Sequence, residues 1–155
     1  MSNLSIQDMD QLDVALASCL RILKQPIYWE KITRFANTTI DRPSATILAI
    51  LAKGPYQFQE LVSRLGVEAP SVSRKVHQLE DQGLILRKPT ADKRVHELYL
   101  SAQGRSLADR LCAARHRLLG EITSTWTARQ QKELIESLEH FSNDLKLLFD
   151  LNHKK

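Results

Sequence analysis

The sequence predicts a mainly α-helical protein with one small β-hairpin, and three observations support this prediction. Apolar residues recur at steps of three and four over most of the chain, as on one face of a helix. Short strand-like runs occur only within residues 84–100. The 155 residues also include only five glycines and five prolines, which favours helices over a loop-rich fold.

Composition excludes several classes of protein. The chain is 43% hydrophobic and 26% charged, and a globular chain of this length folds without disulfides or a structural metal. Two cysteines are too few for a disulfide framework, so we expect reduced thiols and a cytoplasmic protein. The longest apolar run, residues 45–52, is far shorter than the roughly 18 residues that cross a bilayer. The first ten residues lack the basic start of a signal peptide, and we expect no association with membranes.

Residues 1–40 are expected to form two helices. The first carries one apolar face, made by Leu12, Leu16, Cys19 and Leu23. Pro26 removes a backbone donor, so we expect a kink or a new helix there. A second amphipathic stretch follows and ends before the polar residues 37–39.

Three short helices are expected next. Asp41 is a suitable N-cap for the first, with Pro43 in its first turn, and Gly54 with the following proline ends it. The second helix stops at Gly66. The third runs from about residue 69 to 82 and ends at Gly83. Its predicted inward positions are Val72, Val76 and Leu79.

A hairpin with a basic tip follows the third helix. Leu84–Lys88 and Val95–Leu100 are the two strand-like runs, and six polar residues lie between them. Three helices followed by such a hairpin form a winged helix-turn-helix.

The rest of the chain is predicted to be helical. Ser101 caps one long helix, and Thr127 begins a second with a capping box completed by Gln130. The second helix carries a heptad seam of Leu134, Leu138, Phe141, Leu145 and Leu148. As the last long helix of a small chain, it is expected to bury this seam against a second subunit.

The third short helix offers a polar face to a DNA groove. Opposite its buried residues lie Ser71, Ser73, Arg74 and His77. Arg74 can pair with a phosphate or with guanine, and the two serines can bond either phosphate or base. At the hairpin tip, Arg94 suits the negative potential of the minor groove.

These segments resemble MarR-family regulators. Residues 65–74 and 79–85 are similar to the recognition helix of that family and its exit. Asp92-Lys93-Arg94 matches the Asp-x-Arg wing motif, and residues 100–104 resemble the Leu-Thr-x-x-Gly entry into the next helix. Glu68 and Pro70 depart from the family pattern, because the cap there is usually Ser or Thr and the first turn usually holds a small polar residue.

The resemblance implies a cytoplasmic homodimeric transcription factor, a repressor in most members, that binds double-stranded DNA at a pseudo-palindromic operator. It divides the chain into N-terminal dimerisation helices (1–40), a winged helix-turn-helix (41–100) and C-terminal dimerisation helices (101–155). Release by a small phenolic or lipophilic effector is a further family property. The expected DNA-contacting residues are Arg64, Ala69, Pro70, Ser71, Ser73, Arg74, His77, Asp92, Lys93 and Arg94. In the wing, Asp92 orients Arg94 or simply makes the turn.

Other interpretations stay open beside this one. An effector pocket could be lined by Tyr28, Trp29 and Phe35, with Trp126 as a further candidate, although such aromatics are more often dimer core. Cys19 could sense peroxide, but its place on the apolar stripe predicts a buried structural cysteine. Cys112 and His116 have a metal-ligand spacing but no companion pair, so no metal or other cofactor is expected.

Two alternative functions remain: a dimeric protein-interaction module without DNA binding, and a thiol-based redox regulator. No glycine-rich phosphate loop or catalytic constellation is present, so the sequence gives no support to an enzyme. The net charge is +4. Between residues 64 and 94, seven basic residues face four acidic ones, which places +3 on the predicted DNA-binding unit.

Overall fold

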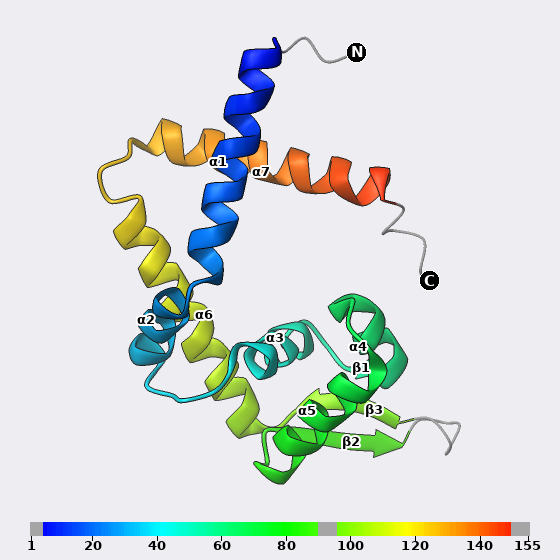
Figure 1. Cartoon of the computed structure of the whole chain (residues 1–155). Coiled ribbons are helices and arrows are strands. Elements are labelled where there is room, and N and C mark those ends of the chain that lie inside the picture. Colours follow the sequence, from blue (N-terminus) through cyan, green and yellow to red (C-terminus); the bar gives the residue numbers. More distant parts are fainter. Residues whose placement is uncertain (1–4, 90–95, 150–155) are drawn as a thin grey trace.

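The computed structural model describes residues 5–89 and 96–149, and Figure 1 shows their arrangement. The elements in chain order are α1 (Ile6–Lys24), α2 (Pro26–Ala36), α3 (Arg42–Leu51), β1 (Tyr56–Gln57), α4 (Phe58–Leu65), α5 (Ala69–Asp81), β2 (Ile85–Pro89), β3 (His96–Leu100), α6 (Ala102–Ile122) and α7 (Ala128–Leu148). The predicted mainly helical fold with a small hairpin is confirmed.

The winged helix-turn-helix, residues 41–100, is called the winged unit below. It contains a three-stranded antiparallel sheet with the strand order β1-β3-β2. Strands β2 and β3 form the predicted hairpin, with Ile85 opposite Leu100 and Arg87 opposite Leu98. Strand β1 was not predicted: Tyr56 pairs with Leu98 on the other edge of β3. Two residues are too few to show an alternating pattern in the sequence.

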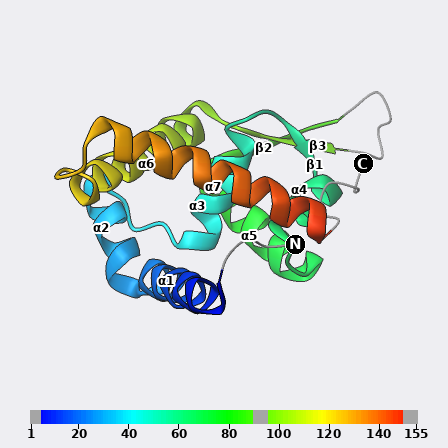
Figure 2. The same ribbon diagram turned by 90° about the horizontal axis from the view of Figure 1, so that it is seen from above.

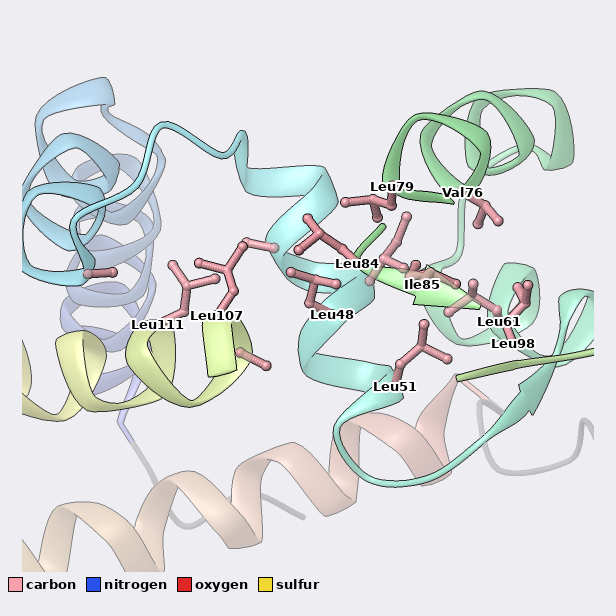
Figure 3. Packing of buried hydrophobic residues seen from close by; sticks show 14 of the residues in the cluster. Leu48, Leu51, Leu61, Val76, Leu79, Leu84, Ile85, Leu98, Leu107 and Leu111 are labelled. Atoms are coloured by element: carbon pink, nitrogen blue, oxygen red, sulfur yellow. The ribbon is translucent and has the colours of Figure 1, made fainter. Parts of the chain in front are cut away.

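The hydrophobic core joins the winged unit to the start of α6. Side chains from α3, α4, α5, the hairpin and α6 point toward one another in Figure 3. Fully buried members include Leu48, Leu61, Val76, Leu79 and Leu111. Because every helix of the unit contributes to this one core, α5 is held on a rigid base.

The helix break at Pro26 is confirmed. Helix α1 ends at Lys24, and α2 begins at Pro26, where a missing amide costs no helical hydrogen bond. Helix α2 then packs along α6, where Lys31 forms a 2.9 Å ion pair with Glu121. The Trp29 indole N–H donates to the carbonyl of Ile40 at 3.0 Å and fixes the connection to α3.

In Figure 1, helices α1 and α7 lie at the end of the molecule opposite the three-stranded sheet, and in the view from above α7 passes over α3 (Figure 2). No residue of either helix is buried within the chain. Their apolar faces lie open: Leu138 is 55% exposed, and Leu16 is 38% exposed. The prediction that Cys19 is buried is therefore wrong for the single chain, because its apolar stripe has no intrachain partner.

The predicted helix caps are confirmed. The Ser101 hydroxyl accepts from the Gly104 amide at 3.0 Å, and the Gln130 carboxamide accepts from the Thr127 amide at 2.9 Å in a capping box. Gly66 ends α4 with a φ of +63°, which favours glycine. Across the described ranges, the helices all lack the length and apolar character required to span a membrane.

Candidate nucleic-acid interface

Helix α5 has one face buried in the core of the winged unit and the opposite face exposed at the surface. Val72, Val76 and Leu79 are 2% exposed or less and anchor one face of the helix in the core. Helix α4 ends at Leu65 with Gly66 as its cap, and α5 begins at Ala69, so a short turn sets the two helices across each other. This packing fixes which α5 side chains face outward.

The outward face carries the residues predicted to meet DNA. Pro70, Ser73, Arg74 and His77 lie opposite the buried stripe, and all four are exposed. Within the part of the chain that the structure describes, the Arg74 guanidinium forms neither a hydrogen bond nor an ion pair. It is therefore a cation held on a rigid helix and open to an anionic partner.

Ser71 lies on the flank of α5 rather than at the centre of this face. It lines a hollow together with Arg74 and Lys75. Ala69 is the first residue of the helix and is partly covered. Arg64 lies on α4, with its guanidinium 4.6 Å from the centre of the Tyr56 ring. The predicted wing residues Asp92, Lys93 and Arg94 lie outside the described residues.

Lys75 is not a free surface cation. Its ammonium nitrogen lies 2.6 Å from the Asp41 carboxylate and 3.3 Å from the Gln78 carboxamide. Asp41 also caps α3 by accepting from the Ser44 amide at 2.8 Å. Partial burial would raise the pKa of Asp41, but the hydrogen bonds from Lys75 and Ser44 outweigh it and hold the pKa below its ordinary value. One carboxylate thus joins the start of α3 to α5.

A second ion pair joins α5 to the hairpin. Glu80, near the end of α5, accepts hydrogen bonds from Nε and Nη2 of Arg87 on β2, the latter at 3.0 Å. The His77 ring lies 3.5 Å away from the same carboxylate. Burial acts to raise the pKa of Glu80, and the Arg87 contact overcomes this and lowers it. Sequence reasoning missed both ion pairs, because nothing in a sequence couples residues 7 or 34 positions apart.

The electrostatic balance of the unit follows from these pairs. Lys75 and Arg87 are neutralised within the fold, whereas Arg74 and Lys88 remain exposed without a described anionic partner. Glu68 is exposed at the start of α5 and adds negative charge there. The winged unit therefore has fewer unpaired cations to offer an anionic partner than the number of its basic residues predicts.

The predicted aromatic pocket is only partly assembled. Tyr28 and Trp29 line a hollow of about 440 Å³ between α2, α3 and α6, together with Arg42 and Arg115. Phe35 lies elsewhere: its ring packs under the Arg117 guanidinium, 4.0 Å from the ring centre.

The Cys112 thiol lies 3.6 Å from Nε2 of His116 on α6. Among the residues that the structure describes, no third Cys, His, Asp or Glu joins them to form a metal cluster. The pair therefore offers two ligands at most.

Comparison with known proteins agrees with this geometry. A family model described as the MarR family matches residues 38–94. The homoprotocatechuate degradative operon repressor of Escherichia coli is 28% identical over 134 residues, which cover 85% of this chain and 88% of the relative.

Solved structures share the fold at low sequence identity. A MarR family protein from Bacillus stearothermophilus superposes with a TM-score of 0.81 at 19% identity, covering 92% of this chain and 99% of that one. Streptococcus pneumoniae FabT, solved in complex with DNA, gives a TM-score of 0.73 at 17% identity over 90% of this chain and 99% of that one. Residues 38–94 are therefore similar to the MarR family in sequence, and the fold of the chain is similar to that of the solved MarR family protein.

Proposed function

We propose that this protein represses transcription in the cytoplasm as a homodimer that binds a pseudo-palindromic operator, acting by binding and not by catalysis. The observation that carries the proposal is the exposed face of α5, where Arg74 stands without a described partner between Ser73 and His77. Such a helix enters the major groove, where an arginine reads guanine or holds a phosphate. The E. coli relative, named as an operon repressor, supports the direction of regulation.

The same residues are proposed as contacts: Arg64, Ala69, Pro70, Ser71, Ser73, Arg74 and His77 from the helices, and Asp92, Lys93 and Arg94 from the wing. Residues 41–100 would then bind DNA, and residues 1–40 and 101–155 would hold the two copies together. The open apolar faces of α1 and α7 support this division, because single chains rarely leave such long apolar faces uncovered. Two-fold symmetry would place the two α5 helices about one DNA turn apart.

Binding to the DNA upstream of the protein's own gene tests the proposal. Arg74→Ala should weaken binding and change sequence preference, because a lost arginine–guanine contact costs about 1–3 kcal/mol. Arg94→Ala should weaken binding across all sequences. Lys132→Ala, on α7, is the control and should leave binding unchanged. A DNA affinity that neither Arg74→Ala nor Arg94→Ala lowers would contradict the proposal.

We further propose that an aromatic acid enters the hollow between α2, α3 and α6 and releases the DNA. Tyr28 and Trp29 supply apolar surface, and Arg42 and Arg115 supply positive charge. Arg42 also donates to the Leu23 carbonyl at 2.9 Å, so it connects the α1 arm to the winged unit. The relative's name refers to an operon for degrading an aromatic acid.

Thermal shift with a panel of hydroxylated aromatic acids tests this effector site, since a bound ligand raises the unfolding temperature. Arg115→Gln should abolish the shift, whereas Arg117→Gln, two positions along the same helix, should preserve it. A shift that survives Arg115→Gln would place the ligand elsewhere.

A further inference from the structure

We infer that Arg42 is a positioning residue that fixes the angle between α1 and α5 within each chain. Arg42 is the first residue of α3 and directly follows Asp41, the cap of that helix. It donates a hydrogen bond to α1, and the neighbouring Asp41 binds α5. The effect of Arg42 on DNA binding rests on the proposed function, in which α1 joins the two copies and α5 enters a DNA groove.

Helix α1 has few other attachments to its own chain. None of its residues is buried, and a single residue, Gln25, separates it from α2. Within residues 5–89 and 96–149, no ion pair joins α1 to another element, and its one hydrogen bond to the winged unit runs from Nη1 of Arg42 to the Leu23 carbonyl at 2.9 Å. This carbonyl is one of the last four of α1, which have no partner inside the helix. A cationic donor suits this position because the helix dipole is negative there.

Arg42 is itself held by two aromatic rings near the start of α2. Its Cζ atom lies 5.9 Å from the centre of the Tyr28 ring and 5.6 Å from that of Trp29. At these distances an aromatic ring attracts a cation. The Trp29 indole is fixed in turn by its hydrogen bond to the Ile40 carbonyl at 3.0 Å. The planar guanidinium is therefore oriented toward α1, and little side-chain freedom is lost when it donates to the carbonyl.

The same end of α3 also holds α5. Asp41 accepts a hydrogen bond from Lys75 of α5 at 2.6 Å and another from the Ser44 amide at 2.8 Å. Helix α3 forms a firm support between these contacts, because Ile47 and Leu48 are buried in the core. Two consecutive residues at the start of one helix thus connect α1 to α5, and neither is among the residues proposed to contact DNA.

The angle between α1 and α5 has a direct consequence in the proposed dimer. If α1 joins the two copies, this angle in each copy sets the distance between the two α5 helices. Successive base pairs lie about 3.4 Å apart along DNA, so a small change in that distance suits a different separation of the half-sites. Arg42 should therefore make the dimer selective for the spacing of the half-sites rather than for their sequence.

Electron spin resonance can follow this angle as a distance between two spin labels on one chain. Val14→Cys places a label on α1 at a position that is 67% exposed, and Asp81→Cys places one at the exposed end of α5. Cys19→Ser and Cys112→Ser remove the other thiols. An excess of unlabelled chain restricts the signal to pairs within one chain. With Arg42 intact, the distance distribution should show one narrow peak.

Matched substitutions then test Arg42 itself. Arg42→Gln should at least double the width of the distribution, because glutamine has neither the reach nor the charge of arginine. Arg42→Lys keeps a cationic donor and should restore most of the narrow width, a rescue that a merely structural role would not produce. Arg34→Gln, at an exposed arginine of α2 without a described partner, is the control and should leave the width unchanged. A narrow distribution in Arg42→Gln, or equal widths in Arg42→Gln and Arg42→Lys, would overturn the inference.

Operators with altered spacing extend the test to DNA. Footprinting of the DNA upstream of the protein's own gene locates the half-sites, and one to three base pairs are then inserted or removed between them. The wild type should lose affinity steeply with each change, whereas the loss in Arg42→Gln should be at least threefold smaller. Equal losses in the two proteins would show that Arg42 does not set the spacing. Absence of DNA binding by the wild type would instead contradict the proposed function, and the label distances would still test Arg42 by themselves.

Discussion

At the scale of single residues, Asp41 has two tasks that can be separated by substitution. It caps α3 through the Ser44 amide and holds Lys75 of α5. Asp41→Ala should lower the free energy of unfolding by about 1–2 kcal/mol through loss of the cap. Asp41→Asn keeps a capping side chain and should cost less than half as much. Urea unfolding at fixed protein concentration measures both, and equal losses would show that the cap is unimportant.

The pH dependence of stability gives a second test of Asp41. Its pKa is lowered in the folded protein, so its charge stabilises the fold above the unfolded pKa of about 3.9. This contribution is lost as the pH falls through the folded pKa. The wild type should therefore lose its advantage over Asp41→Asn below about pH 4. A stability difference that stays constant between pH 6 and pH 3 would contradict this account.

Gly104 is the residue whose replacement should be most damaging for its size. A Cβ at this position would lie 2.0 Å from the carbonyl oxygen of Leu84, a backbone atom that cannot move aside cheaply. Gly104→Ala should destabilise the protein by about 2–4 kcal/mol. Gly120→Ala is the control, since nothing lies within 4 Å there and a helical alanine should stabilise by up to about 1 kcal/mol. Urea unfolding of both variants measures these changes in the free energy of unfolding.

Residue-level features that depend on near neighbours in sequence were predictable. Thr127 with Gln130, Ser101 and Asp41 as caps all follow from local chemistry and are confirmed. Partners distant in sequence were not predictable, and the ion pair between Lys75 and Asp41 is one example. A sequence shows that two charges exist but not that the fold brings them to 2.6 Å.

At the scale of elements, the Glu80–Arg87 pair ties the wing to α5. Glu80→Gln should lower the unfolding free energy by only about 0.5–1 kcal/mol, but it should weaken DNA binding several-fold because the hairpin loses its fixed angle to the recognition helix. Titration of labelled DNA measures this effect. Glu133→Gln breaks a comparable 2.7 Å pair with Arg129 inside α7 and is the control. Equal DNA affinity in wild type and Glu80→Gln would show that the wing is oriented without this pair.

Element boundaries followed closely from the sequence where a strong signal marks them. Pro26 and Gly66 stand at the predicted breaks, and β2, the first strand of the hairpin, begins one residue later than expected. Strand β1 was missed because its existence depends on β3, not on its own two residues. Amphipathic periodicity revealed helix α1 but not what covers its apolar face, which is why Cys19 was wrongly predicted as buried.

At the scale of the whole molecule, the proposed dimer would cover the exposed apolar faces of α1 and α7. Leu16→Asp places a charge on the α1 stripe and should convert the dimer to a monomer at micromolar concentration. Val14→Asp, at a position 67% exposed and outside the stripe, should leave the dimer intact. Light scattering after gel filtration measures both masses. A wild-type mass of a single chain, 17.7 kDa, would contradict the proposed dimer.

The central claim is that the α5 faces of two joined copies bind DNA through its phosphates and bases. The measurement that tests it most directly is the salt dependence of affinity for the DNA upstream of the protein's own gene. Each neutralised phosphate contributes about 0.9 to the slope of log affinity against log salt, so a dimer should give a slope several units below zero. Arg74→Gln, altered twice in each dimer, should reduce its magnitude by about one or two units. A slope near zero, or equal affinity for upstream and unrelated DNA, would contradict the account.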